Sequence, residues 1–203
     1  MFYTLAIKTE KSCPVFIDGV LSESFYPGAY DEGMSGSWYY SEPGEPLALL
    51  PGKLLLITKD KGYNFDFRTA FEGHIVSEQF LSIFKTLKTG KWETAELSIV
   101  NPKGDNICAK KYYFIRQIMQ EQETPAVIDP DKSNINYRKS GEIKNVIALA
   151  IKDDVKLDFF SIFEISLLGY TFVSSGAAEA FLKYEMKGFE LVSTEKIGTV
   201  RRA

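Results

Sequence analysis

The stretch IVSEQFLSIFKTLKTG, residues 75–90, decides the fold class, because it joins a strand signal to a capped amphipathic helix. Two β-branched residues come first, and Ser77 then offers the side-chain oxygen that a helix N-terminus prefers. The apolar positions that follow repeat at i, i+3, i+4 and i+7: Phe80, Ile83, Phe84 and Leu87. This spacing predicts an amphipathic helix over about 77–89 that ends before Gly90.

A second stretch, FVSSGAAEAFLKYEMKG at residues 172–188, follows the same order of signals. Ser174 or Ser175 can cap it, an apolar stripe follows, and Gly188 stops it, which predicts a helix over about 175–187. Strand-like segments come after both helices, at residues 95–100 and 189–193. Two interpretations remain open: an internal duplication, or two ordinary strand–helix–strand units.

The rest of the chain is predicted to form short strands joined by turns and loops. Residues 159–165 fit either a strand or a short helix, and Asp18-Gly19 has the composition of a turn. Further strands are expected at residues 2–7, 15–17, 47–58 with a break at Pro51-Gly52, 65–67, 111–118, 126–128 and 142–151. The fold class is therefore α+β, a mixed and mainly antiparallel sheet with two helices and a β/loop-rich N-terminal third. We expect one domain over residues 1–203, with 1–70 and 71–203 as its alternative subdivision.

Composition excludes several classes of function. The net charge is −3 over 203 residues, so the chain has no field that attracts nucleic acid. No secretory signal and no apolar run long enough to span a membrane is present, which favours a cytoplasmic location. Cys13 and Cys108 stand alone in the sequence, and we expect two free thiols rather than a disulfide.

The sequence contains no pattern typical of catalysis or metal binding. A lone histidine, His74, cannot supply a His-rich metal site, and no nucleotide-binding, zinc-protease or serine-hydrolase motif occurs. Residues 129–140 open like a calcium loop, but Asn134 and Ser140 occupy the positions of the required Gly and Glu, so a turn built on Asp129 is expected. We predict no catalytic residue, no metal and no cofactor, and hence a protein that is not an enzyme.

The charge distribution gives the strongest functional signal. Residues 12–52 contain no Lys and no Arg but six acidic residues, whereas the rest of the chain is net positive. An acidic loop with aromatic side chains has the composition of a surface that binds a basic protein. The alternative is that the aromatic side chains pack onto the core and the acidic ones only solvate the loop. The candidate partner-binding residues are Tyr30, Asp31, Glu32, Trp38, Tyr39, Tyr40, Glu42 and Glu45.

Several short motifs give the chain a family resemblance. The run from Tyr170 to Leu191, the hexapeptide IVSEQF at residues 75–80, and Val127-Ile128-Asp129 with Ser133 resemble segments of bacterial immunity proteins of polymorphic toxin systems. The chain is similar to the immunity protein 43 group and its relatives in the immunity protein 11 group. These motifs belong to the scaffold, so they transfer no toxin-contacting residue.

The resemblance implies a protein that binds and neutralises a cognate antibacterial toxin, by covering its active site, in the cell that produces both. Such toxins include nucleases with basic clefts and are delivered by contact-dependent or type VI-like secretion. The predicted partner is thus a toxin protein, with no direct contact to nucleic acid or membrane. Two alternatives stay open: an enzyme that reverses the toxin's modification of its target, and a protein-interaction module unrelated to toxins.

Overall fold

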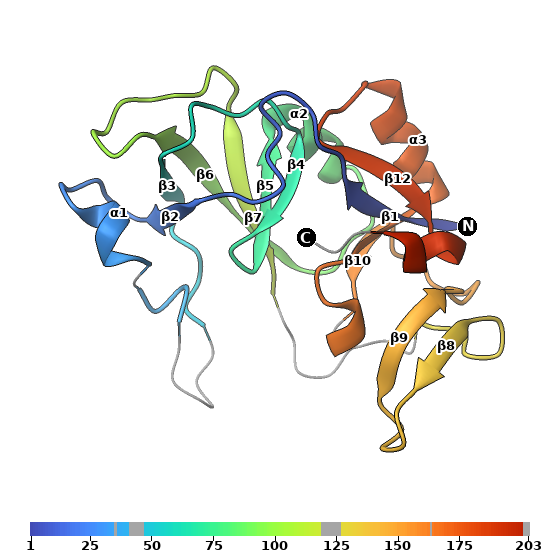
Figure 1. Ribbon diagram of the computed structural model, residues 1–203. Helices are drawn as coiled ribbons and strands as arrows, with labels where there is room; N and C mark the ends of the chain where they lie inside the picture. The colour runs from blue at the N-terminus through green and yellow to red at the C-terminus, as the bar shows by residue number, and fades with distance from the viewer. Residues whose placement is uncertain (35, 41–46, 119–126, 163, 201–203) are drawn as a thin grey trace.

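The structure is a computed structural model, and it describes residues 1–34, 36–40, 47–118, 127–162 and 164–200. In these ranges the chain forms two main sheets, a separate hairpin and short helices, an α+β architecture as predicted (Figure 1). The hairpin consists of β8 (Asn134–Tyr137) and β9 (Ile143–Ala148).

The larger sheet has six strands, and its neighbouring strands are antiparallel except for the parallel pair β3 and β6. In spatial order its strands are β2 (Gly19–Ser22), β3 (Lys53–Thr58), β6 (Trp92–Val100), β7 (Tyr112–Gln117), β5 (Gly73–Ser77) and β4 (Phe67–Ala70).

The smaller sheet has four strands and is antiparallel throughout. In spatial order its strands are β10 (Phe159–Ser161), β11 (Thr171–Ser174), β1 (Phe2–Ile7) and β12 (Phe189–Ser193). The strand nearest the N-terminus therefore lies between two strands from the C-terminal part of the chain.

Both predicted helices are present and begin at the predicted serine caps. Helix α2 (Glu78–Phe84) follows Ser77, whose Oγ accepts from the Phe80 N–H at 3.2 Å. Helix α3 (Ser175–Lys183) follows Ser174, which accepts from the Ala177 N–H at 3.2 Å. Both helices end several residues earlier than predicted. The remaining helical elements are α1 (Ala29–Glu32), η1 (Ile165–Leu167) and η2 (Thr194–Thr199).

The two helices belong to units with the same topology. Helix α2 joins β5 to β6, and these strands flank the antiparallel β7; helix α3 joins β11 to β12, and these flank the antiparallel β1. An antiparallel edge strand completes each unit, β4 beside β5 and β10 beside β11. The units differ in where the central strand lies in the sequence. In the first unit β7 follows the helix, whereas in the second unit β1 comes from the N-terminus of the chain. The likeness between the two stretches of sequence thus extends to strand order and direction.

The main core lies where the two units meet. The rings of Phe80 on α2 and Phe181 on α3 stack at a centroid distance of 4.6 Å and an interplanar angle of 10°. Along β5, Val76 faces this core, while the neighbouring Ile75 faces a second core on the opposite side of the sheet. The second core is closed by residues of the N-terminal part of the chain, including Cys13, Leu21 and Trp38. This alternation is the period of two expected of a sheet covered on both faces.

Four local predictions in the N-terminal third are wrong. Residues 15–17 do not form a strand, and residues 47–50 precede β3 without joining it. Of the strand predicted at residues 65–67 only Phe67 belongs to one, as the first residue of β4, and Gly19 begins β2 instead of making a turn. The reason for the last is close contact, because a Cβ on Gly19 would lie 2.8 Å from the carbonyl oxygen of Ile57 on β3. Glycine at this position lets β2 approach β3 closely. From the sequence alone, a glycine needed for such a close approach looks the same as a glycine needed for a turn.

Candidate functional site

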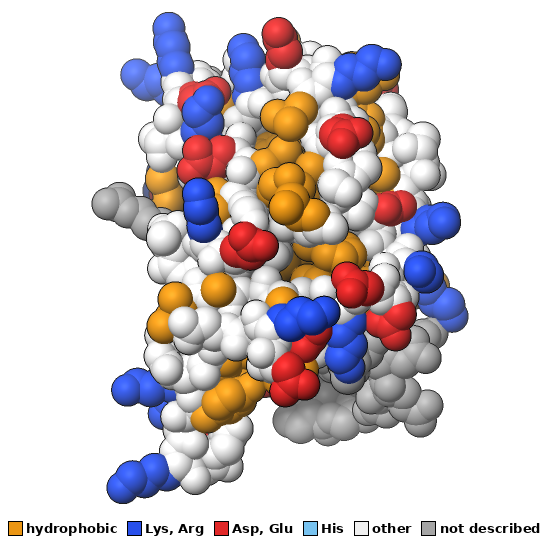
Figure 2. All heavy atoms as spheres, turned by 90° about the vertical axis from the view of Figure 1, so that its right-hand side faces the viewer, with side chains coloured by type: hydrophobic (Ala, Val, Ile, Leu, Met, Phe, Trp, Pro, Cys, Tyr) orange, Lys and Arg blue, Asp and Glu red, His pale blue; other side chains and the backbone are white. Residues whose placement is uncertain are grey.

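The cation-free stretch, residues 12–52, is called here the N-terminal segment. Several of its described side chains, among them Cys13, Trp38 and Leu50, pack in the second core on one face of the six-stranded sheet. The regular elements of the segment are β2 and α1, which lie at the end of the molecule away from the hairpin β8–β9 (Figure 1). Figure 2 shows the opposite end, where a strip of apolar side chains has acidic and basic side chains on both sides.

Four described acidic residues of this segment, Asp18, Glu23, Asp31 and Glu32, are exposed. Three of their carboxylates accept a hydrogen bond from an aromatic side chain: Asp18 from Tyr30 Oη at 2.9 Å, Glu32 from Tyr26 Oη at 2.9 Å, and Glu23 from Trp38 Nε1 at 2.8 Å. The aromatic donors thus hold the carboxylates in fixed positions.

These donors are neutral, so the negative charge of the carboxylates remains. No side-chain nitrogen of a described Lys or Arg lies within 4.0 Å of a carboxylate oxygen of Asp18, Glu23, Asp31 or Glu32. Hydrogen bonding to a carboxylate also raises the pKa of the Tyr26 and Tyr30 phenols, as expected beside a negative charge. One cation borders the cluster, since Lys59 Nζ lies 4.1 Å from the centroid of the Tyr30 ring, but it forms no ion pair with these carboxylates. The surface is therefore a set of carboxylates without ion-pair partners, of which Asp18, Glu23 and Glu32 are oriented by aromatic donors.

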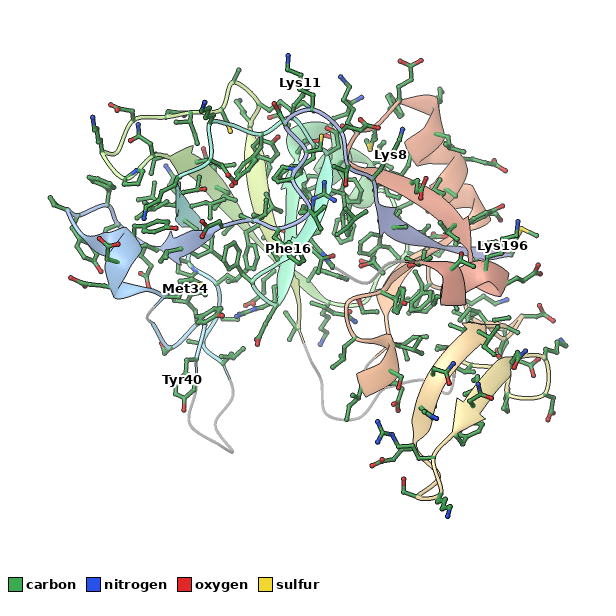
Figure 3. All side chains as sticks on the ribbon, viewed as in Figure 1. Lys8, Lys11, Phe16, Met34, Tyr40 and Lys196 are labelled. Atoms are coloured by element: carbon green, nitrogen blue, oxygen red, sulfur yellow. The ribbon has the colours of Figure 1, made fainter. Side chains whose placement is uncertain are left out.

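The aromatic candidates divide between the core and the surface. Trp38 is only 3% exposed, so its ring cannot contact a partner; it instead fills the second core and orients Glu23. Tyr30 and Tyr39 are half-buried, whereas Tyr40 is 65% exposed and points away from the sheet (Figure 3). Glu42 and Glu45 lie outside the described residues.

A buried ion pair, which the sequence did not indicate, holds the segment against the sheet. Arg116 on β7 pairs with Glu93 on β6, and both side chains are 11% exposed. The Arg116 guanidinium also donates to the carbonyl oxygens of Trp38 and, at 3.0 Å, Ala48, while Glu93 accepts from the Leu50 N–H at 3.2 Å. We call these two side chains the Arg116–Glu93 clamp. It connects two parts of the segment ten residues apart to the same point on the sheet.

Exposed apolar side chains lie beside the clamp. Leu49 is 78% exposed and Leu47 is 39% exposed, on either side of Ala48. The apolar character of residues 47–50 predicts a strand. Because of that interpretation, Leu47 and Leu49 were not recognised as surface residues from the sequence. Phe16, in the part of the segment before β2, is also 71% exposed (Figure 3).

The other candidates for chemistry have structural surroundings. His74 is buried among aromatic rings, its Nδ1 is 3.1 Å from Thr69 Oγ1, and burial lowers its pKa to about 3. Cys13 and Cys108 are free thiols, and burial raises the pKa of each. Asp129 forms the expected turn, with its Oδ1 accepting from the Lys132 N–H at 3.3 Å. Within the described ranges, no three His, Cys, Asp or Glu side chains are grouped to hold a metal ion.

The strands and short helices described above make this an α+β protein. A family model, Immunity protein 43, matches residues 5–200, and the chain therefore belongs to the immunity protein 43 family. The match confirms the family resemblance and includes the N-terminal segment, which contributed none of the motifs quoted for that resemblance. A search of curated proteins gave no match. No helix among the described residues has the length and apolar character needed to cross a membrane.

Proposed function

We propose that this immunity protein neutralises its cognate toxin by binding a cationic surface of that toxin through the N-terminal segment. The binding is stoichiometric, takes place in the cytoplasm of the producing cell, and covers the toxin's active site. The observation that carries the proposal is the set of four exposed carboxylates that form no ion pair with a described Lys or Arg, three of which aromatic donors hold in place.

Orientation matters because a partner then gains the charge interaction without ordering the carboxylate side chains. Immobilising a flexible side chain at an interface costs about 0.5–1.5 kcal/mol, and hydrogen bonds from Tyr26, Tyr30 and Trp38 meet part of that cost during folding. Each carboxylate has further lone pairs available for Lys or Arg of the partner. Complementary charge also accelerates encounter and disfavours acidic partners.

The experiment uses the polypeptide encoded beside this chain's gene as the partner. The test variant combines Asp18→Asn, Glu23→Gln, Asp31→Asn and Glu32→Gln, which removes four charges and retains the acceptor oxygens for the aromatic donors. The control variant combines Glu179→Gln, Glu185→Gln, Glu190→Gln and Glu195→Gln, which removes four exposed charges from the C-terminal part of the chain. Both changes raise the net charge equally.

We expect co-expression with the wild-type chain to rescue growth, at one molecule of this protein per molecule of toxin. The test variant should bind at least about tenfold more weakly in 0.15 M salt, with a flatter salt dependence than the control variant. Equal affinity of the two variants would overturn the placement of the interface. Rescue at far less than one molecule per toxin would favour an enzyme that reverses the toxin's damage.

A further inference from the structure

The exposed apolar side chains beside the clamp suggest a second contribution to binding at this end of the molecule. Charge alone would not provide it. We propose that Tyr40, Leu47 and Leu49 form an apolar anchor that inserts into a hydrophobic depression inside the cationic surface of the toxin. This inference rests on the proposed function, and it names the shape and chemistry of the partner: an apolar pocket rimmed by Lys or Arg.

Exposure is the first argument. Single exposed leucines are ordinary on protein surfaces, but here Leu49 and Tyr40 are each about two-thirds or more exposed, at 78% and 65%, and Leu47 lies two residues from Leu49. The Ala48 N–H donates to the Ser37 carbonyl oxygen at 3.0 Å, which brings the stretch before Tyr40 beside the two leucines.

The clamp is the second argument, because it fixes the backbone that carries the anchor. Arg116 binds the carbonyl oxygens of Trp38 and Ala48, two residues before Tyr40 and between the two leucines. Burying an ion pair is costly, and replacing such a pair by apolar side chains of similar size is often neutral or stabilising. A clamp that holds exposed apolar groups in one place is explained by what it does for binding, since a rigid anchor loses little entropy when it is buried by a partner.

Charge is the third argument, and it selects the partner. Trp38 links the two surfaces, because its indole N–H donates to Glu23 while its carbonyl oxygen accepts from Arg116. Trp38 therefore joins the backbone of the anchor to one oriented carboxylate, that of Glu23, in a segment whose sequence contains no cation. An apolar site beside such a surface fits a partner whose own apolar pocket is bordered by basic side chains, the arrangement of a central hot spot with a charged rim.

The two parts of the surface should differ in kinetics, which allows a separate test. Association and dissociation rates are measured with the polypeptide from the neighbouring gene, in 0.05 M and 0.3 M salt. The test variant is Leu47→Ser with Leu49→Ser, and the control is Ile165→Ser with Leu182→Ser, which changes two side chains that are 81% and 67% exposed elsewhere. Thermal unfolding of both variants should match the wild type, because all four side chains are at the surface.

We expect the anchor variant to dissociate at least about tenfold faster, with an unchanged salt dependence of association, because apolar hot spots act mainly on dissociation. The control variant should dissociate like the wild type. One outcome would overturn this inference and leave the proposed function standing. In it, neutralising the four carboxylates weakens the complex, but the anchor variant dissociates at the wild-type rate. Failure of the wild-type chain to associate at all would overturn both.

Discussion

The carbonyl oxygen of Trp38 accepts a hydrogen bond from Nη1 of Arg116, a residue 78 positions further along the chain. This contact fixes the N-terminal segment to the middle of the six-stranded sheet. The same guanidinium binds Glu93 and the Ala48 carbonyl oxygen, so one side chain determines the path of the backbone around the proposed anchor. Replacing Arg116 should therefore disturb the N-terminal segment more than the six-stranded sheet.

Substitution Glu93→Gln should destabilise the protein by about 3 kcal/mol, because it leaves the buried Arg116 charge without its partner. Urea unfolding measures the loss, and hydrogen exchange should show faster exchange at Ala48 and Leu50 than at residues of β7. The exposed pair of Lys111 and Glu78 provides a control: Glu78→Gln should cost less than about 1 kcal/mol. Equal losses for the two pairs would contradict the clamp.

Arg68 should be replaceable by an apolar residue without loss of stability. Its side chain is 1% exposed, and its Nε and Nη2 have no hydrogen-bond partner among the described atoms, while Nη1 donates to the Gly188 carbonyl oxygen at 2.9 Å. That oxygen also accepts from the Lys8 N–H at 3.0 Å, so it stays satisfied in the variant. We expect Arg68→Met to leave the free energy of unfolding unchanged or raise it by about 1–3 kcal/mol.

The control for Arg68→Met is Arg116→Met, which removes a partner from Glu93 and should destabilise by about 3 kcal/mol. Urea unfolding at pH 7.5 compares the two. A loss above about 2 kcal/mol in Arg68→Met would contradict this prediction and show that the guanidinium stabilises the fold through its hydrogen bond to Gly188 and its contact with the Phe65 ring, whose centroid lies 5.4 Å from Arg68 Cζ.

Buried His74 should make stability fall as the pH decreases below about 6.5. Burial lowers the pKa of its imidazole to about 3, whereas the unfolded chain protonates near 6.5. Between these values only the unfolded state binds the proton, so the contribution is complete above pH 6.5 and is lost as the pH falls towards 3. The expected loss at pH 5 is about 2 kcal/mol relative to pH 7.5.

Urea unfolding of the wild type and of His74→Phe at pH 7.5, 6 and 5 measures this contribution as the difference between their pH profiles. In the folded wild type, the proton NMR signal of this single histidine should not titrate between pH 7.5 and 4.5. A titration midpoint near 6.5 in the folded state would contradict the buried placement of His74.

The two serine caps should contribute unequally. Ser77→Ala should cost about 1 kcal/mol, the usual value for a lost N-cap. Ser174→Ala should cost about 2 kcal/mol, because Ser174 Oγ also donates to Asp158 Oδ1 at 2.6 Å. Ser175→Ala is the matched control and should stay within about 0.5 kcal/mol. A larger effect at Ser175 than at Ser174 would place the cap one residue later than the structure does.

Local signals explain what could be predicted from the sequence. Ser77 and Ser174 were identified as caps because a cap is read from a side chain and the periodicity that directly follows it. Strand β12 was predicted with its exact observed range, residues 189–193, because a glycine stop precedes it. The early ends of α2 and α3 were not predicted. The backbone leaves α2 soon after Phe84, where Lys88 is held by Asp158 from a distant part of the chain.

The remaining features depend on contacts between residues far apart in the sequence. No local pattern shows that β1 pairs with β11 and β12, or that Arg116 reaches the carbonyl oxygen of Trp38. The composition of residues 12–52 identified an unusual segment but could not separate buried Trp38 from exposed Tyr40. It also gave no reason to name Leu49, because an apolar run before a strand has the same composition as the strand itself.

The most direct test of the binding surface is hydrogen exchange of this protein alone and in complex with the polypeptide from the neighbouring gene. We predict slower exchange in the complex at residues 16–40 and 47–50, and little change in α3, β12 and the hairpin β8–β9. Protection of α3 and β12, the face shown in Figure 2, with unchanged exchange in the N-terminal segment would contradict the account.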